Sequence, residues 1–570
     1  MKTIRLVLVR GLHSQLRRLL RTFALAFKKM NVKCANLIKK PMNFLRSLLS
    51  LVLVTAKELG SKACKINGRK RRFKFNEERQ KGVWLRMHHP TANHSNNNIE
   101  AVAFEVNGTQ TGFLKDITCA DGSKENVKTY TLYQARWFVL LAVCLVNMAY
   151  NALWITFSSI SDIAVMYYTI EPLVVDWLSM SFLLAFMLFA LPAAGFLSTY
   201  GLRATILVAA ILNTCGTFTR SMGIQRDGFV YIVAGQLMIA VSGPFIAAVP
   251  PELATTWFGE HERAIATSIG VLMSYVGVAV GFLQPTFIVP DSKDLNRVLE
   301  GIDYLVRSQA IFCSLSLVLV VLLVKDKPAT PPSLSQELRG NKLDNIDVSF
   351  FTSIKLLAKD LDFNLTAQAY GIMFGLLTVI STLLNQLVKA NLKTLPDSQI
   401  GLMGFVATII GIIGILLFGF WIEAFQLYKF TATFVYVVGT ICLVCFSASI
   451  QWAKSYNFIF VSFCVFNLVA VPYTSFGLEQ IAEITYPLSE FTTCTLAMMT
   501  GNMYGLVLTY IFGWMVEMDM LKPVNCGCIA LSILGLILVL IAKVPMKRTE
   551  MDHAKVQSTP LINKFNYEST

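Results

Sequence analysis

The chain between Arg136 and about Lys543 alternates long apolar runs with short polar links, and this pattern limits the fold more than any other feature. Hydrophobic residues are 54% of the chain and charged residues 15%, which is too little charge to cover a water-soluble protein of 570 residues. A helix needs roughly 20 apolar residues to cross the bilayer core. Lipid offers no hydrogen-bond partner to backbone amides, so the spans should be helices rather than open strands. We therefore predict twelve membrane-spanning helices, near 136–158, 177–198, 204–222, 229–251, 264–288, 303–324, 367–391, 400–421, 429–450, 456–478, 490–516 and 524–543.

The twelve spans divide into two related sets of six. Segment 252–263 after the fourth span resembles segment 480–490 after the tenth, with Ala254 matching Ala482 and Glu262 matching Glu490 at one offset. A coincidence between short segments is the alternative. We predict an all-α membrane protein with two pseudo-symmetric six-helix bundles, the build of transporters that rock around a midplane site. The predicted domains are an arm (1–130), the N-terminal bundle (131–324), a Pro-rich linker (325–366), the C-terminal bundle (367–543) and a tail (544–570).

The arm carries much of the net charge of +15, because residues 1–57 hold thirteen Lys or Arg and no acid. We predict a mostly disordered cytosolic arm that contacts anionic lipid head groups; a mitochondrial-type presequence is the alternative. Basic residues flank the same side of the bundles, so both termini are expected in the cytosol. We expect the plasma membrane, with a mitochondrial or lysosomal membrane as alternatives, and no nucleic-acid partner.

The sequence contains no arrangement that points to an enzyme. The twelve cysteines lie mostly inside apolar runs, and no Cys/His spacing is typical of a zinc site. Nucleophile constellations and phosphate-binding loops are also missing from the sequence. We predict a monomer without catalytic residues, metal or cofactor, whose partners are a small-molecule substrate and the bilayer.

Ionisable residues are expected to be nearly absent from the depth of the spans, which argues against a pump driven through a buried carboxylate. Asp162 and Asp176 are placed at the external face. A facilitator or exchanger is favoured. Charged residues near the cytosolic span ends are predicted to control the gate: Arg203, Glu252, Arg263, Glu423 and Glu483.

Neutral polar and aromatic side chains occupy the predicted depth, and an aromatic face surrounded by amides suits an organic cation. Interhelical hydrogen bonding is the alternative for each amide, and an interfacial position is the alternative for Trp154. The predicted substrate-binding residues are Trp154, Gln236, Thr378, Asn502, Asn385 and Gln386.

Several segments of the membrane part resemble the major facilitator superfamily, and within it the feline leukaemia virus subgroup C receptor-related family (solute carrier family 49). The resemblance rests on Arg136-Trp-Phe-Val-Leu-Leu, Asp176-Trp-Leu-Ser-Met, Trp257-Phe-Gly, Gly281-Phe-Leu-Gln-Pro, Ile380-Ser-Thr-Leu-Leu-Asn-Gln and Glu483-Ile-Thr-Tyr-Pro-Leu-Ser-Glu. Gly201-Leu-Arg-Ala-Thr and Gly259-Glu-His-Glu-Arg-Ala look closest to the branch called major facilitator superfamily domain-containing protein seven.

The resemblance implies transport of choline, ethanolamine or haem by alternating access. Choline-binding members use a Trp on span 1, a Gln on span 4, a Tyr on span 7 and a Gln on span 11. The first two match Trp154 and Gln236, whereas the third and fourth fall on Thr378 and Asn502. We therefore expect a choline- or ethanolamine-like amine as substrate. Export of haem, or a receptor or scaffold that transports nothing, are the alternatives.

Overall fold

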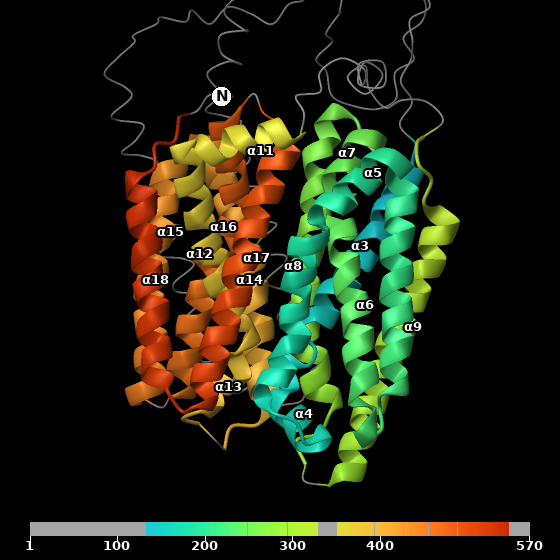
Figure 1. Cartoon of the computed structure of the whole chain (residues 1–570), viewed down its shortest axis with the longest axis vertical. Helices are drawn as coiled ribbons and strands as arrows, with labels where there is room; N and C mark the ends of the chain where they lie inside the picture. The colour runs from blue at the N-terminus through green and yellow to red at the C-terminus, as the bar shows by residue number, and fades with distance from the viewer. Residues whose placement is uncertain are drawn as a thin grey trace, which may run out of the picture. The chain divides into compact units, whose positions relative to one another are not determined.

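The computed structural model describes residues 133–328 and 350–545, apart from 248, 293, 393, 426, 454, 487 and 489 and the side chains of 260, 261, 264, 350–354, 423, 424, 453, 490 and 491. The predicted basic arm therefore lies outside the described residues, as does nearly all of the predicted tail. The described part is built from helices that pack side by side (Figure 1).

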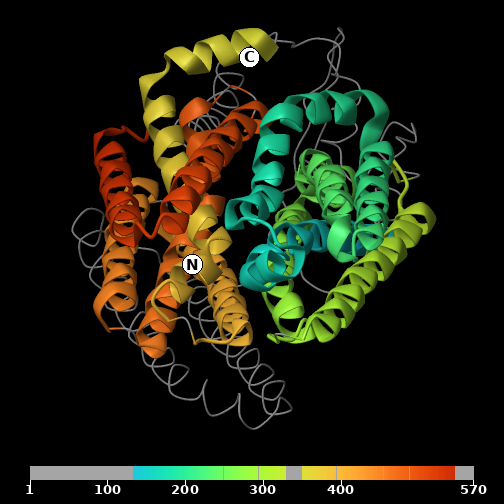
Figure 2. The same cartoon turned by 60° about the horizontal axis from the view of Figure 1, so that its bottom comes forward.

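The first group of helices corresponds to the predicted N-terminal bundle. α3 packs against α5, α6, α8 and α9, and α5 packs along α6 (Figure 2). The group comprises α3 (Ala135–Ile155), η1 (Ser158–Ile160), α4 (Ser161–Tyr168), α5 (Pro172–Met222), η2 (Arg226–Gly228), α6 (Phe229–Ala247), α7 (Val249–Trp257), α8 (Glu260–Ile288) and α9 (Leu295–Leu323).

The second group corresponds to the predicted C-terminal bundle. α12 packs against α16, α17 and α18, and α15 packs against α16 and α18. The group comprises α11 (Phe350–Lys359), α12 (Leu361–Thr382), α13 (Leu384–Lys389), α14 (Asp397–Phe425), α15 (Tyr428–Ala448), η3 (Ser449–Ala453), α16 (Tyr456–Thr485), α17 (Glu490–Glu517) and α18 (Leu521–Ile541). α4 and α13 lie at one end of the two groups, here called the α13 end, and α7 and α11 lie at the other, here called the linker end (Figure 1).

Eleven helices of the described part are long and apolar enough to cross a membrane. The twelfth predicted span is contained in α5, whose 51 residues are more than twice the length that one crossing requires. α5 turns back at Gly201, which has φ 84° and ψ −179° inside an otherwise helical run. A side chain would be strained in this left-handed region. The backbone N–H of Arg203 donates to Asp326 Oδ1 at 2.9 Å, which fixes the turn.

Two elements differ from those predicted. Span 7 breaks at Leu383, which leaves helical geometry with φ −89° and ψ 8° and starts α13 at a new angle. The linker contains α11, where Leu357 is buried and Leu356 is exposed, so this segment is helical and not fully solvated.

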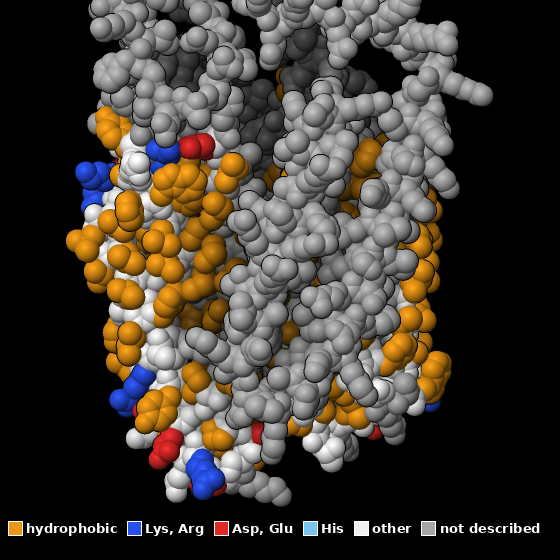
Figure 3. Space-filling model, turned by 180° about the vertical axis from the view of Figure 1, so that it is seen from behind, with side chains coloured by type: hydrophobic (Ala, Val, Ile, Leu, Met, Phe, Trp, Pro, Cys, Tyr) orange, Lys and Arg blue, Asp and Glu red, His pale blue; other side chains and the backbone are white. Residues whose placement is uncertain are grey.

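The outer surface has the composition that lipid requires. Large apolar side chains such as Ile311, Leu315 and Leu322 are exposed on α9. Figure 3 shows that hydrophobic side chains cover the middle of the described face, while Lys, Arg, Asp and Glu gather toward its ends. This distribution is the one expected for helices whose middle contacts acyl chains and whose ends contact head groups.

α5 and α6 approach closely through two glycines. A Cβ at Gly235 would lie 2.4 Å from the carbonyl oxygen of Gly216, and a Cβ at Gly216 would lie 2.6 Å from that of Gly235. Small residues permit such close contact between membrane helices.

We expect Gly235→Ala to lower the stability of the protein by about 1–3 kcal/mol, because the two backbones must separate to admit a methyl group. The measurement is the thermal unfolding midpoint in detergent. Gly195→Ala is the control, since nothing lies within 4 Å of a Cβ there. Equal midpoints for the two variants would contradict the tight contact between α5 and α6.

Candidate functional site: a central path and its closure

Trp154 and Gln236 lie together in the N-terminal bundle. Gln236 of α6 is buried, and its Nε2 donates to the carbonyl oxygen of Leu153 at 3.2 Å, next to Trp154 on α3. Trp154 packs against a cluster that includes Phe182 of α5. Neither Trp154 Nε1 nor Gln236 Oε1 has a hydrogen-bond partner among the described residues. A ligand that accepts from the indole and donates to the amide would satisfy both groups.

Thr378 and Asn502 lie on two helices of the C-terminal bundle that pack together. Thr378 of α12 is buried, and a Cβ at Gly505 of α17 would lie 3.3 Å from its Cγ2. Asn502 lies one turn before Gly505 and donates through Nδ2 to the carbonyl oxygen of Met498 at 2.8 Å. Because the amide nitrogen is used within α17, its carbonyl oxygen is the group left to face a ligand.

Leu183 of α5 connects these two pairs. A Cβ at Gly505 would lie 3.2 Å from Leu183 Cδ1. The preceding residue, Phe182, packs in the same cluster as Trp154. α5 therefore touches the surroundings of both pairs, through Phe182 beside Trp154 and through Leu183 beside Gly505, which also neighbours Thr378.

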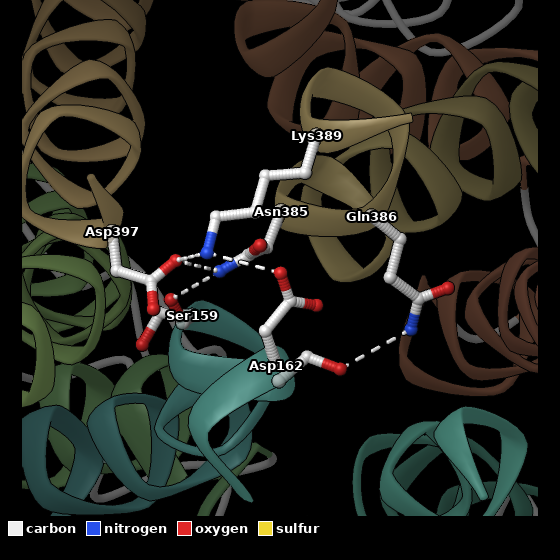
Figure 4. Close-up of polar contacts among 7 residues, drawn as sticks. Ser159, Asp162, Asn385, Gln386, Lys389 and Asp397 are labelled. Atoms are coloured by element: carbon white, nitrogen blue, oxygen red, sulfur yellow. Dashed lines mark hydrogen bonds and ion pairs between the residues drawn. The ribbon is translucent and has the colours of Figure 1, made fainter. Parts of the chain in front are cut away.

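Asn385 and Lys389 join the bundles at the α13 end. Asn385 Nδ2 donates to the carbonyl oxygen of Ser159 at 3.0 Å and to Asp397 Oδ1 at 2.8 Å. Lys389 Nζ lies 3.0 Å from Asp162 Oδ2 and also pairs with Asp397 (Figure 4). The short helix that begins after Leu383 points both side chains toward η1 and α4, so the break in span 7 positions this cluster.

Gln386 forms a second connection beside the first. Its Nε2 donates to Asp176 Oδ1 at 2.8 Å and to Ser161 Oγ at 3.3 Å. Asp176 is fully buried, and its Oδ2 has no hydrogen-bond partner among the described residues. We call Ser159, Asp162, Asp176, Asn385, Gln386, Lys389 and Asp397 the closure cluster. Asn385 and Gln386, predicted to bind substrate, lie in it and connect the two bundles.

Lys389 contacts a carboxylate from each bundle, Asp162 of α4 and Asp397 of α14. Because one ammonium pairs with both acids, Lys389 joins the two groups of helices at the α13 end.

Buried or partly buried ionisable residues are found at the ends of the predicted spans. Asp176 and Asp397 are buried, and Lys389 lies within the predicted span 367–391. Arg220 of α5 is also fully buried, with its guanidinium 4.8 Å from the centroid of the Phe157 ring. No guanidinium nitrogen of Arg220 has a hydrogen-bond partner in the described part of the chain. Each of these charged residues lies inside or next to an apolar run of the sequence. They could have been recognised as candidate functional residues, because burying a charge in lipid is costly and is usually kept only for a function.

The residues predicted to control the gate lie at the linker end. Arg203 is exposed after the turn at Gly201, and Glu252, Arg263 and Glu483 each make further interactions. The side chain of Glu423, at the end of α14, lies outside the described residues. Sequence reasoning missed the ion pair between Arg136 and Glu262, whose Nε–Oε2 distance of 3.0 Å ties α3 to α8 at this end. Figure 1 shows α7 at this end.

Comparison with known proteins identifies the family of the chain. The sequence model of the Major Facilitator Superfamily matches residues 139–482, which is more than half of the chain. The chain belongs to the major facilitator superfamily. It is a multi-pass membrane protein that transports by alternating access and is not an enzyme.

Curated relatives place the chain within the feline leukaemia virus subgroup C receptor-related family. It is 29% identical to "Choline/ethanolamine transporter FLVCR2" of Homo sapiens over 446 residues, which cover 78% of this chain and 83% of the relative. It is 30% identical to "Choline/ethanolamine transporter flvcr2a" of Danio rerio, covering 69% of this chain and 83% of the relative. It is 30% identical to "Choline/ethanolamine transporter FLVCR1" of Felis catus, covering 75% of this chain and 76% of the relative. The predicted family is thereby confirmed.

Solved structures show the same fold. A bacterial homologue of the human lysosomal transporter Spinster, in an inward-facing and unoccupied conformation, aligns with a TM-score of 0.56 at 12% identity, covering 72% of this chain and 98% of that one. A D-xylose-proton symporter aligns with a TM-score of 0.55 at 12% identity, with the same coverage. The predicted fold class, two six-helix bundles of the major facilitator type, is confirmed.

Proposed function

We propose that this transporter carries a small organic amine cation of the choline and ethanolamine class. The observation that carries the proposal is the pair formed by Trp154 and Gln236, two side chains that match the choline-binding pattern of the family. Trp154 Nε1 and Gln236 Oε1 are buried and lack partners among the described residues. A desolvated indole face attracts an ammonium by up to about 2 kcal/mol.

Thr378 and Asn502 favour ethanolamine over choline. A quaternary ammonium has no N–H, so it is held best by an aromatic enclosure, and Thr378 removes one aromatic wall of that enclosure. A primary ammonium has three N–H donors. The hydroxyl oxygen of Thr378 and the carbonyl oxygen of Asn502 can accept from such donors, as can Gln236 Oε1. The substitution of hydrogen-bond acceptors for aromatic surface thus changes which amine fits.

The closure cluster supports alternating access around this site. Asn385, Gln386 and Lys389 would hold the bundles together at the α13 end while the substrate exchanges at the linker end. In this proposal Arg203, Glu252, Arg263, Glu423 and Glu483 act when the linker end closes. We place the linker end in the cytosol of a plasma-membrane transporter, following the distribution of basic residues.

Uptake in cells that express the full chain tests this proposal. Labelled ethanolamine, choline and haem are supplied separately, and we expect ethanolamine to accumulate fastest, choline more slowly, and haem at the rate of control cells. Faster movement of choline than ethanolamine would overturn the assignment of Thr378 and Asn502. Movement of haem with neither amine would overturn the proposed substrate class.

A further inference from the structure

A cavity of about 220 Å³ is lined by residues of α3, α8 and α9. None of its lining residues is among those predicted to bind substrate. They are Met148, Ala149, Ala152, Leu153, Val280, Gln284, Ser308, Gln309, Phe312 and Cys313.

The lining changes from apolar to polar along the membrane normal. On α9, Ser308 and Gln309 lie nearer the α13 end than Phe312 and Cys313, by about 6 Å at helical rise. On α8, Gln284 lies about 6 Å nearer that end than Val280. The two helices therefore place their polar residues at one depth and their apolar residues deeper in the bilayer.

The polar level coincides with the boundary of the membrane. The α9 segment that precedes Ser308 is charged and includes the ion pair between Arg307 and Asp303. The segment that follows is apolar and exposes Ile311 and Leu315. Lipid head groups meet acyl chains at such a transition.

The cavity is accessible from the outer surface of the bundle. Gln284, Ser308 and Phe312 are half-buried, although each lines the cavity. Just outside it, Ile311 of α9 has 69% of its surface exposed and Phe287 of α8 has 50%. Part of the cavity wall therefore lies at the surface of the bundle, within reach of an apolar molecule in the bilayer.

One strong acceptor in the cavity lacks a donor. Gln309 is 4% exposed, and its Nε2 donates to Thr156 Oγ1 at 3.1 Å and to Gln284 Oε1 at 3.3 Å. Gln284 Nε2 donates in turn to Ser308 Oγ at 3.0 Å. These bonds orient Gln309 and leave its Oε1 without a partner among the described residues. Buried amide oxygens normally accept a hydrogen bond.

We propose that this cavity binds the hydroxyl end of a neutral membrane amphiphile of the sterol class. The hydroxyl would donate to Gln309 Oε1 at the membrane boundary, and the apolar body would follow Val280 and Phe312 toward the middle of the bilayer. A phosphate head group is disfavoured because every lining residue is uncharged. The site is independent of the amine proposed to bind at Trp154 and Gln236.

Photo-crosslinking of the full chain in nanodiscs tests the proposal. The probe is a clickable sterol that carries a photoreactive group, and labelled peptides are located by mass spectrometry. We expect labelling of α8 and α9 peptides, competition by unlabelled sterol, and no competition by phosphatidylcholine. Gln309→Leu, which removes the acceptor, and Val280→Trp, which fills the cavity, are each expected to reduce labelling at least fivefold.

Val318→Trp is the matched control, because Val318 lies on the lipid-exposed face of α9 with 52% of its surface accessible. It should label as the unchanged protein does, and thermal unfolding identifies any variant that fails to fold. Equal labelling of all variants, or labelling confined to other helices, would overturn the site. Competition by diacylglycerol but not by sterol would overturn the sterol class.

Discussion

Gln386→Leu is expected to weaken closure at the α13 end by about 1–3 kcal/mol, which is roughly a 5- to 150-fold shift in the equilibrium between closed and open states. Gln386 is the only described hydrogen-bond donor to the fully buried carboxylate of Asp176. Leucine keeps the approximate volume but leaves that carboxylate without a donor. When the α13 end opens, water can hydrate Asp176, so the substitution penalises the closed state specifically.

Hydrogen exchange of the α13 peptide measures this shift. Its amides should exchange roughly 5- to 150-fold faster in Gln386→Leu, in proportion to the open population. Gln225→Leu is the matched control, since Gln225 is an exposed residue between α5 and α6 at the same end. If α13 exchanged at the same rate in both variants, the contact between Gln386 and Asp176 would have no part in closure.

Trp154→Ala is expected to weaken binding of the transported amine roughly 30-fold, corresponding to a desolvated cation–π contact of about 2 kcal/mol. Trp154→Phe retains a smaller aromatic face and should lose only a part of that affinity. The measurement is the concentration of amine that gives half-maximal uptake, corrected for the amount of folded protein at the membrane.

Trp452→Ala provides the comparison for Trp154→Ala. Trp452 has 79% of its surface exposed in η3, so its removal should leave the half-maximal concentration unchanged. Similar values for Trp154→Ala and the unchanged protein would show that Trp154 serves packing alone.

The spans could be predicted from sequence because lipid imposes a length and an apolar composition on each helix. The turn at Gly201 also had a local signal, a glycine. The break at Leu383 had none, because an apolar residue between Thr382 and Leu384 gives no indication of a helix end. The helical character of α11 was hidden by the charged and proline-rich segment around it.

The site was predictable to a similar degree. The family resemblance pairs Trp154 with Gln236, and the structure brings them to the same part of the N-terminal bundle. The closure cluster could not be derived, because Lys389 and Asp162 are 227 positions apart in sequence and meet only through packing of the two bundles. Lys389 and Arg220 nevertheless lay inside predicted spans, where a charge is itself a signal of function.

Transport by purified protein in liposomes tests the central claim most directly. Liposomes that contain the full chain are loaded with unlabelled ethanolamine and diluted into labelled ethanolamine. We predict accumulation of label above protein-free liposomes, with external choline competing less effectively than external ethanolamine. Absence of exchange with either amine, in protein shown to be folded by its thermal transition, would contradict the account.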